Sequence, residues 1–190
     1  MTIPAVEGEV VRGRRVILRE KRLSDAAQDY AWRSDPELAR FDAANPFSAS
    51  FGDYLSLLRE ELEYANPFRR SLSILDLEGR HIGNVMYYNI DLGRREAELG
   101  ITIGDRSLWG QGYGSDAMEA FLRHLFERVG LRRVYLKTLD WNERARRCFE
   151  RVGFVAHGAM RRGLHNFILM EARREWFQPA PEAAGEPWVG

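Results

Sequence analysis

The 190-residue chain has little of what marks several specialised classes of protein. Its single cysteine, Cys148, excludes disulfides within the chain and leaves no cysteine spacing for a metal site, as is usual in a reducing compartment. No apolar run approaches the ~20 residues of a membrane-spanning helix, and the acidic N-terminus is not a signal peptide. The 28 basic and 28 acidic residues give zero formal net charge, so no overall positive field favours nucleic acid. We therefore expect a cytoplasmic protein with neither membrane nor nucleic acid as a partner.

Length and composition suit a single domain with a substantial core, since 45% of the residues are hydrophobic. We expect this domain at 10–177, after an N-terminal extension at 1–9 and before a flexible tail at 178–190. Alternating and apolar segments predict strands at 10–19, 70–75, 81–89, 96–103, 132–138, 154–160 and 167–174. Helices are expected at 24–32, at 51–62, after residue 112 as far as 129, and at 142–152. Strands with helices between them indicate a mixed sheet covered by helices.

The most informative segment is the glycine-rich run at 109–115, with the sequence WGQGYGS. A strand precedes it, and an apolar helical stripe follows it from Met118 to Val129. Such a turn exposes backbone N–H groups at the positive end of a helix, where phosphate or pyrophosphate binds readily. Glycine lets the backbone approach the anion closely, because no Cβ stands in the way.

Three kinds of phosphate loop compete for this segment, together with a plain surface turn. A P-loop is excluded because no lysine follows the glycines. A dinucleotide fingerprint would place Ser115 at its last glycine, and although Asp140 follows the next strand, too little chain remains for a second nucleotide half. The third is the [QR]-x-x-G-x-[GA] loop that grips coenzyme A, which residues 112–114 match at its end, although Trp109 stands at its first position.

Two further segments agree with the third reading. Residues 142–154 resemble the second signature of the GNAT N-acetyltransferases, N-x-x-[AS]-x-x-x-[YF]-E-[KR]-x-G-F, at the family's usual distance from the glycine loop. Residues 97–104 and the tryptophan at 109 resemble the branch that contains ribosomal-protein N-terminal acetyltransferases and spermidine acetyltransferases. The resemblance runs from about Val10 to Trp176. It implies an α/β fold with a mixed central sheet of about seven strands, covered by helices on both faces.

The resemblance also implies where acetyl-CoA, the cosubstrate, would bind. The strands 96–103 and 132–138 would splay apart to form its cleft, and no metal is implied. A bulge at Gly100 would turn backbone groups toward the ligand, although packing against the long helix explains this glycine nearly as well. The implied coenzyme contacts are Ile101, Thr102, Ile103, Trp109, Gly110, Gln111, Gly112, Tyr113, Gly114, Ser115 and Asn142.

Acetyl transfer to an amine requires a base, because a lysine-like amine with a pKa near 10.4 is almost wholly protonated at neutral pH. Glu98 is the candidate, since it shares a strand face with Gly100 and Thr102 and some family members place a glutamate on this strand. The alternative is a structural carboxylate paired with Arg94 or Arg95.

The general acid is less well defined. Phe149 and Ala145 stand where the family often has tyrosine and serine, so the proton for the departing thiolate would come from water, Tyr113 or Cys148. Cys148 also fits a buried small hydrophobe, and Asn142 fits an ordinary helix N-cap.

The expected function is acetyl transfer to a primary amine, such as a peptide N-terminal α-amine, a small amine or a polyamine, by a monomer or homodimer. The missing acids leave a non-catalytic acyl-CoA-binding protein as the alternative. Arg144, Arg146 and Arg147 could reach the ribose 3′-phosphate or form a solvated helix face.

Overall fold

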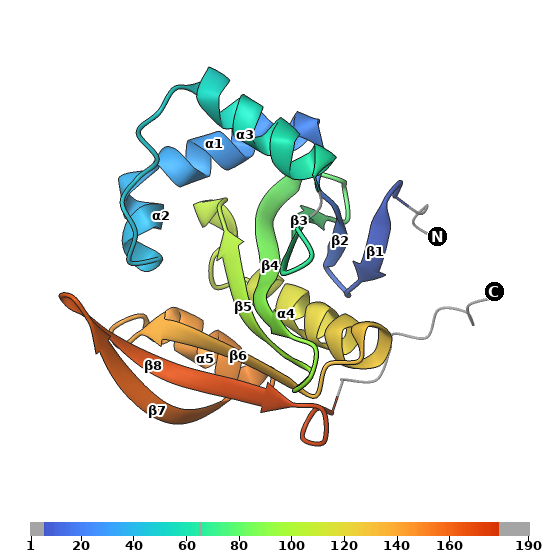
Figure 1. The fold of residues 1–190 in the computed structure, drawn as a ribbon, viewed down its shortest axis with the longest axis vertical. Coiled ribbons are helices and arrows are strands. Elements are labelled where there is room, and N and C mark those ends of the chain that lie inside the picture. The colour runs from blue at the N-terminus through green and yellow to red at the C-terminus, as the bar shows by residue number, and fades with distance from the viewer. Residues whose placement is uncertain (1–5, 65, 179–190) are drawn as a thin grey trace.

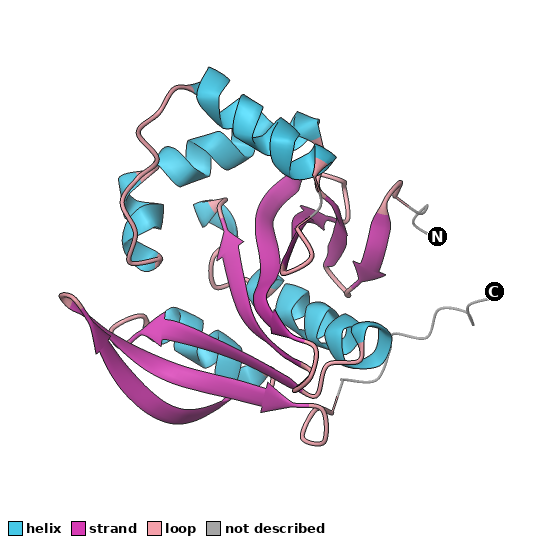
Figure 2. Cartoon of the chain, viewed as in Figure 1, coloured by secondary structure: helices cyan, strands magenta, loops and turns pink. Residues whose placement is uncertain are grey.

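The computed structural model describes residues 6–64 and 66–178 and contains one eight-stranded sheet (Figures 1 and 2). The strand order is β1-β2-β3-β4-β5-β6-β8-β7, and every neighbouring pair is antiparallel except β5 and β6, which are parallel. The strands are β1 (Glu9–Arg12), β2 (Val16–Glu20), β3 (Arg69–Asp76), β4 (His81–Asp91), β5 (Glu96–Ile103), β6 (Arg133–Leu139), β7 (Val155–Arg162) and β8 (His165–Arg173).

The helices lie between these strands, as expected for a mixed α/β fold. They are η1 (Leu23–Asp25), α1 (Ala26–Ser34), α2 (Pro36–Phe41), α3 (Phe51–Glu63), η2 (Arg106–Leu108), α4 (Tyr113–His124), the π-helical turn η3 (Leu125–Val129) and α5 (Glu143–Arg151). Helix α3 begins with the expected capping box, in which Ser50 and Asp53 bond each other's backbone N–H groups.

The sheet has eight strands rather than seven, because the single strand expected at 10–19 is two strands. The chain turns back at residues 13–15 and packs against α4. There the buried carboxylate of Asp116 accepts the backbone N–H groups of Arg14, Arg15 and Val16, at 3.0, 2.7 and 3.1 Å. Gly13 is required, since a Cβ would lie 2.3 Å from an oxygen of Asp116. The turn therefore depends on a residue about 100 positions away.

Helices cover both faces of the sheet, and strand alternation decides which residues each face buries. Leu18, Leu72 and Val85 belong to the main core, which contains Met118, Phe121 and Leu122 of α4. The adjacent polar residues on the same strands, Arg19, Ser73 and Asn84, face η1 and α1 instead. A second, small apolar cluster joins α1 to α3 through Ala26, Tyr54 and Leu58.

Strands β5 and β6 part soon after they meet, as the sequence predicted. They pair only at Glu96–Arg133, Ala97–Val134 and Glu98–Tyr135, and beyond these pairs the strands diverge (Figure 1). The bulge expected at Gly100 is not found in the pairing with β4, where Gly100 faces Met86 in regular register. The irregularity lies in β4 between Tyr88 and Asp91 instead.

The expected chain ends fall mostly outside the described residues. This holds for residues 1–5 of the N-terminal extension and for 179–190 of the tail, while Glu9 already belongs to β1. Among the described residues, no helix is both long and apolar enough to cross a bilayer.

Candidate active site

The glycine-rich run leads from η2 into α4 with the geometry of an anion-binding loop. Gly110 and Gly112 have φ of +76° and +89°, a conformation that favours glycine, and Gly112 is the N-cap of α4. The N–H groups of Tyr113, Gly114 and Ser115 donate to no acceptor in the part of the chain that the structure describes. These three donors at the positive end of a 12-residue helix suit a phosphate group.

Aromatic and cationic side chains hold the loop in place. The indole N–H of Trp109 donates to the carbonyl of Ile103 at 2.7 Å, which ties the loop to the end of β5. The guanidinium of Arg144 lies 3.4 Å from the ring centroid of Trp109 and 4.9 Å from that of Phe41. Burial lowers the pKa of Arg144. It forms no salt bridge with a carboxylate among the described residues, so its charge is available to an anionic ligand.

The coenzyme cavity, as we name it, has a volume of about 570 Å³ and opens between the diverging strands and the loop. This volume lies in the range of small-molecule sites. Most of the residues expected to contact coenzyme line it, namely Ile101, Thr102, Ile103, Trp109, Gly110, Gly112, Gly114, Ser115 and Asn142. Gln111 and Tyr113 are not among the lining residues. Gln111 instead donates to the carbonyl of Ser107 at 2.5 Å, and the ring of Tyr113 packs against the core.

Glu98 is buried on the strand face opposite Leu99 and has three partners. Its carboxylate accepts hydrogen bonds from Tyr88 at 2.9 Å and Asn89 at 3.0 Å, and it pairs with Lys137. Asn89 reaches it because the irregularity in β4 gives this residue a φ of +52°, which asparagine tolerates. The expected alternative partners, Arg94 and Arg95, do not bond Glu98. Glu98 does not line the cavity, although Tyr88 and Lys137 do.

Phe149 and Ala145 stand where the family often has an acid, and neither side chain can donate a proton to the leaving thiolate. Phe149 is buried against Phe154, with ring centroids 5.9 Å apart. Cys148 accepts a hydrogen bond from Ser115 at 3.3 Å beside the glycine loop, and burial raises the pKa of its thiol. Asn142 caps α5 by accepting the N–H of Ala145 at 3.3 Å.

An adjoining cavity, which we name the acceptor cavity, has a volume of about 840 Å³ and lies between the sheet and helices α1–α3. The sequence favours two segments beside an acceptor, 41–50 and 160–166, and only the first contributes to the lining of this cavity. Its wall includes aromatic side chains such as Phe47, Tyr54 and Phe68. The residues that line both cavities are Leu38, Asp42, Met86, Tyr88 and Thr102. The two cavities therefore meet at this junction.

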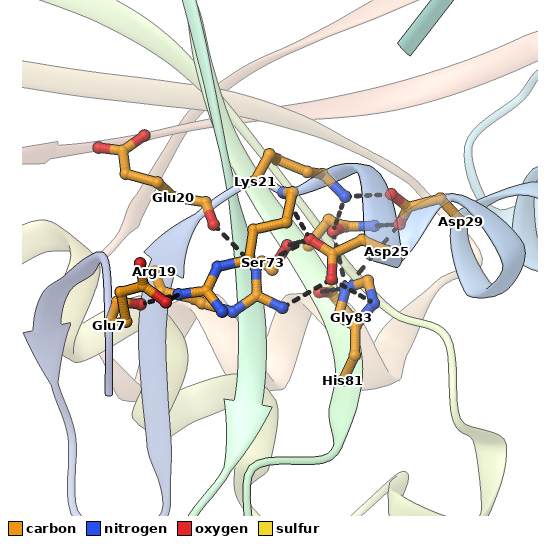
Figure 3. A network of polar contacts seen from close by, with 11 residues as sticks. Glu7, Arg19, Glu20, Lys21, Asp25, Asp29, Ser73, His81 and Gly83 are labelled. Carbon is orange, nitrogen blue, oxygen red and sulfur yellow. Dashed lines mark hydrogen bonds and ion pairs between the residues drawn. The ribbon is translucent and has the colours of Figure 1, made fainter. Parts of the chain in front are cut away.

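A buried polar network lies behind the acceptor cavity (Figure 3), and three of its members, Lys21, Asp29 and Asn84, line that cavity. Arg19 forms a bidentate pair with Asp25 at 2.6 and 2.8 Å, and Ser73 donates to the same carboxylate at 2.7 Å. Lys21 pairs with Asp29 and donates to Asn84 at 2.6 Å. The network therefore fastens η1 and α1 to β2, β3 and β4.

Burial lowers the pKa of two members of this network, Lys21 and His81. The ammonium of Lys21 has a lowered pKa, although Asp29 opposes the shift. The imidazole of His81 also has a lowered pKa, because it is buried near Lys21. His81 is therefore a neutral member of the network at pH 7.

Asp42, at the C-terminal end of α2, faces the junction of the two cavities. Asp42 is an exposed residue, and the protein around its carboxyl nevertheless desolvates the charged form. This desolvation raises the pKa of the carboxyl to about 6, although Arg33 partly opposes the shift. Asp42 accepts no hydrogen bond and forms no ion pair with any described residue. The sequence places Asp42 only as the acidic residue of the segment 41–50, which we expect beside the acceptor, and no motif assigns it a role.

Comparison with known proteins agrees with this geometry. The family model described as acetyltransferase (GNAT) domain matches residues 15–155. YdaF of Bacillus subtilis (strain 168), named provisionally as a ribosomal N-acetyltransferase, is 30% identical over 143 residues, which are 72% of this chain and 77% of YdaF. The uncharacterized N-acetyltransferase p20 of Bacillus licheniformis is 25% identical over 155 residues, which cover 80% of this chain and 86% of p20.

Solved structures share the fold at lower identity. Spermidine N-acetyltransferase from Vibrio cholerae, in complex with CoA and spermine, superposes with a TM-score of 0.76 at 20% identity and covers 85% of this chain and 96% of its own. Mycobacterium smegmatis RimJ, in complex with CoA-disulfide, gives 0.72 at 23% identity and covers 87% of each chain. By its family match and its relatives, the chain belongs to the GNAT acetyltransferases.

Proposed function

We propose that this protein is an acetyl-CoA-dependent N-acetyltransferase that moves an acetyl group directly to a primary amine, either a peptide N-terminal α-amine or a small amine. The observation that carries the proposal is the pair of cavities that meet at Asp42, Tyr88 and Thr102. One cavity has the anion-binding loop, and the other provides room for a second substrate. A transferase needs both, whereas a protein that only stores coenzyme needs one.

The coenzyme would bind along the loop and the open edge of β5. The free N–H groups of Tyr113, Gly114 and Ser115 would hold the pyrophosphate, assisted by the charge of Arg144. The backbone of β5 from Ile101 to Ile103 would bond the pantetheine arm, where β6 has diverged. A strand N–H at the thioester oxygen would stabilise the oxyanion, an interaction that contributes about 3–4 kcal/mol in other enzymes.

A carboxylate must take the acceptor's proton, and two are available near the junction. Glu98 would act through the hydroxyl of Tyr88, which bonds it at 2.9 Å and lines both cavities. Asp42 faces the junction directly. The leaving thiolate needs no dedicated acid, because thiols near pKa 8.5 are weakly basic. The lack of a hydroxyl at Phe149 and Ala145 is therefore compatible with catalysis.

Acetyl transfer itself tests the proposal. The protein is incubated with acetyl-CoA and a panel of acceptors: a peptide with a free N-terminus, the same peptide N-terminally blocked with one free lysine, and spermidine. Thiol release and the mass of the product are measured together with direct coenzyme binding. We expect thiol release to match the acetylated amine one to one. Coenzyme binding without transfer to any amine would instead support the non-catalytic acyl-CoA-binding alternative.

A further inference from the structure

The position of Asp42 is unusual among the carboxylates of the site. It is the only carboxylate of the described residues that lines the coenzyme cavity, and it lines the acceptor cavity as well. An acceptor amine must pass this junction to reach a thioester held in the coenzyme cavity. Asp42 therefore lies where the nitrogen of the acceptor and the carbon of the acetyl group have to meet.

Helix α2 holds Asp42 there by contacts to the coenzyme loop. Asp35 caps the helix by accepting the N–H groups of Glu37 and Leu38 at 2.8 and 3.0 Å. Arg106, just before the glycine run, bonds Asp35 at 2.5 Å and Glu37 at 3.1 Å. Phe41, next to Asp42, packs edge-on against Trp109 with ring centroids 5.4 Å apart. The helix that carries Asp42 is thus fixed relative to the coenzyme site.

The other acidic side chains near the acceptor already have partners. Asp29 pairs with Lys21 and accepts a hydrogen bond from Asn84 at 2.6 Å. Glu61 lies 3.9 Å from Arg69, and Glu98 has its three partners on β4 and β6. Asp42 is therefore the carboxylate that is free to receive an ammonium group.

The charges of the acceptor cavity indicate an acceptor with one positive charge. Its lining has three carboxylates, on Asp29, Asp42 and Glu61, and three cations, on Lys21, Arg33 and Arg69. Once Asp42 is paired with an ammonium, the remaining lining has one excess positive charge. Further ammonium groups of a polyamine would meet repulsion, whereas a carbonyl or carboxylate beside the amine would meet Arg33, whose guanidinium lies 5.8 Å from the ring of Phe47.

We propose that Asp42 binds the ammonium group of the acceptor and takes its proton, and that it thereby selects a singly charged amine of low basicity, the α-amine of a peptide, over lysine side chains and polyamines. This inference rests on the proposed acetyltransferase function. Glu98 and Tyr88 then position the junction without exchanging a proton with the substrate.

The proton balance of this step is complete. The acceptor ammonium gives one proton to the carboxylate of Asp42, and the neutral amine attacks the thioester carbonyl, forming the N–C bond. Collapse of the tetrahedral intermediate breaks the C–S bond. The nitrogen then loses a second proton, which neutralises the departing thiolate as coenzyme A. Asp42 finally releases its proton to water, so one proton enters the solvent for each acetyl group transferred.

The raised pKa of Asp42, about 6, fits this role. An α-amine has a pKa of about 7.7–8.0, roughly two units above that of Asp42, whereas a lysine amine at about 10.4 is more than four units above it. Proton transfer to Asp42 is therefore much less unfavourable from an α-amine. The described groups that act electrostatically on Asp42 or respond to its charge are Arg33 from α1 and Tyr88 from β4.

The test compares three charge-neutralising variants on the three acceptors of the panel. Asp42→Asn removes the proposed base, and Glu98→Gln removes the other candidate. Glu60→Gln is the matched control, since Glu60 is exposed on α3 and lines neither cavity. For each variant, kcat/KM is measured from pH 5 to 9.5, with the coenzyme Kd and thermal unfolding as controls for folding.

We expect wild type to lose activity as the pH falls through about 6 and to prefer the free N-terminus. Asp42→Asn should lose about 100-fold or more in kcat/KM at pH 7, the lower end of the range for a general base. About a tenth of an α-amine is neutral at pH 7, and most of it is neutral at pH 9. The loss of kcat/KM in Asp42→Asn relative to wild type should therefore become about tenfold smaller between pH 7 and pH 9. Its coenzyme Kd should not change.

Two results would overturn the inference. One is that Asp42→Asn keeps the wild-type dependence of kcat/KM on pH while Glu98→Gln no longer shows the fall in activity near pH 6. This result would assign the base to Glu98 acting through Tyr88. The other is faster transfer to spermidine or lysine than to the α-amine. If wild type binds acetyl-CoA but acetylates no amine, the proposed function fails, and the inference fails with it.

Discussion

Replacing Gly114 by alanine separates coenzyme binding from folding at the glycine loop. Gly114 is the second residue of α4 and lines the coenzyme cavity, and its φ is not positive. An added Cβ would lie 3.7 Å from both Cys148 Sγ and Ile103 Cγ1, which is ordinary van der Waals contact. The fold should therefore accept the methyl group, although the methyl would stand where a phosphate has to approach.

Gly114→Ala should preserve or raise the stability of the fold and should weaken the binding of coenzyme A. Alanine is favoured over glycine in a helix by up to about 1 kcal/mol, so Tm should stay level or rise by about 2–4 °C. Losing a hydrogen bond to a charged phosphate costs about 1.5–3 kcal/mol, which corresponds to a Kd for coenzyme A raised about 10- to 150-fold. Titration calorimetry measures the Kd, and thermal unfolding without ligand measures the Tm.

Gly52→Ala provides a matched control. Gly52 is also the second residue of its helix, α3, has no positive φ and lines neither cavity. It should gain stability in the same way and keep the wild-type Kd. If Gly114→Ala is folded and its Kd stays within twofold of wild type, the phosphate does not bind on this loop.

Three further predictions concern other parts of the site. Asp25→Asn should destabilise the fold by about 3–5 kcal/mol, because it leaves Arg19 buried without its partner. Burial alone would raise the pKa of Asp25, but hydrogen bonds led by that from Arg19 hold it well below its ordinary value of 3.8. Wild-type stability should therefore fall as the pH drops below about 4, while the variant lacks this contribution; urea unfolding at pH 3 and 7 checks both. Phe149→Tyr should keep coenzyme affinity and modestly increase turnover, and unchanged turnover would show that another group already supplies the thiolate's proton. Arg144→Ala should raise the Kd for coenzyme A and make this Kd less dependent on salt, because a guanidinium without an ion-pair partner is lost from the cavity wall. If the salt dependence of the Kd is unchanged, the phosphates bind elsewhere.

The sequence predicted those parts of the molecule whose signals are local. Strand β5 has the predicted bounds, and the cap of α3 is a four-residue pattern that is visible in the chain. The glycine run likewise shows its turn and the start of α4 in adjacent residues. These features depend on spacing and local backbone preference, which a single sequence contains.

Features that depend on distant partners could not be predicted in the same way. The break between β1 and β2 depends on Asp116, and the buried polar network joins residues that are up to 63 positions apart. The partners of Glu98 come from β4 and β6, so the alternative of a pairing with Arg94 or Arg95 is not found. Asp42 belongs to a segment that the sequence favours beside the acceptor, but its place at the junction of the two cavities depends on the folded position of α2.

A crystal structure with bound acetyl-CoA and a peptide acceptor tests the central claim most directly. We expect the pyrophosphate on the N–H groups of residues 113–115 and the thioester at the junction of the two cavities. The acceptor nitrogen should lie within hydrogen-bond distance of Asp42 and beyond the reach of Glu98. Coenzyme bound away from the glycine loop, or an acceptor nitrogen that contacts Glu98 or Tyr88 and not Asp42, would contradict the account.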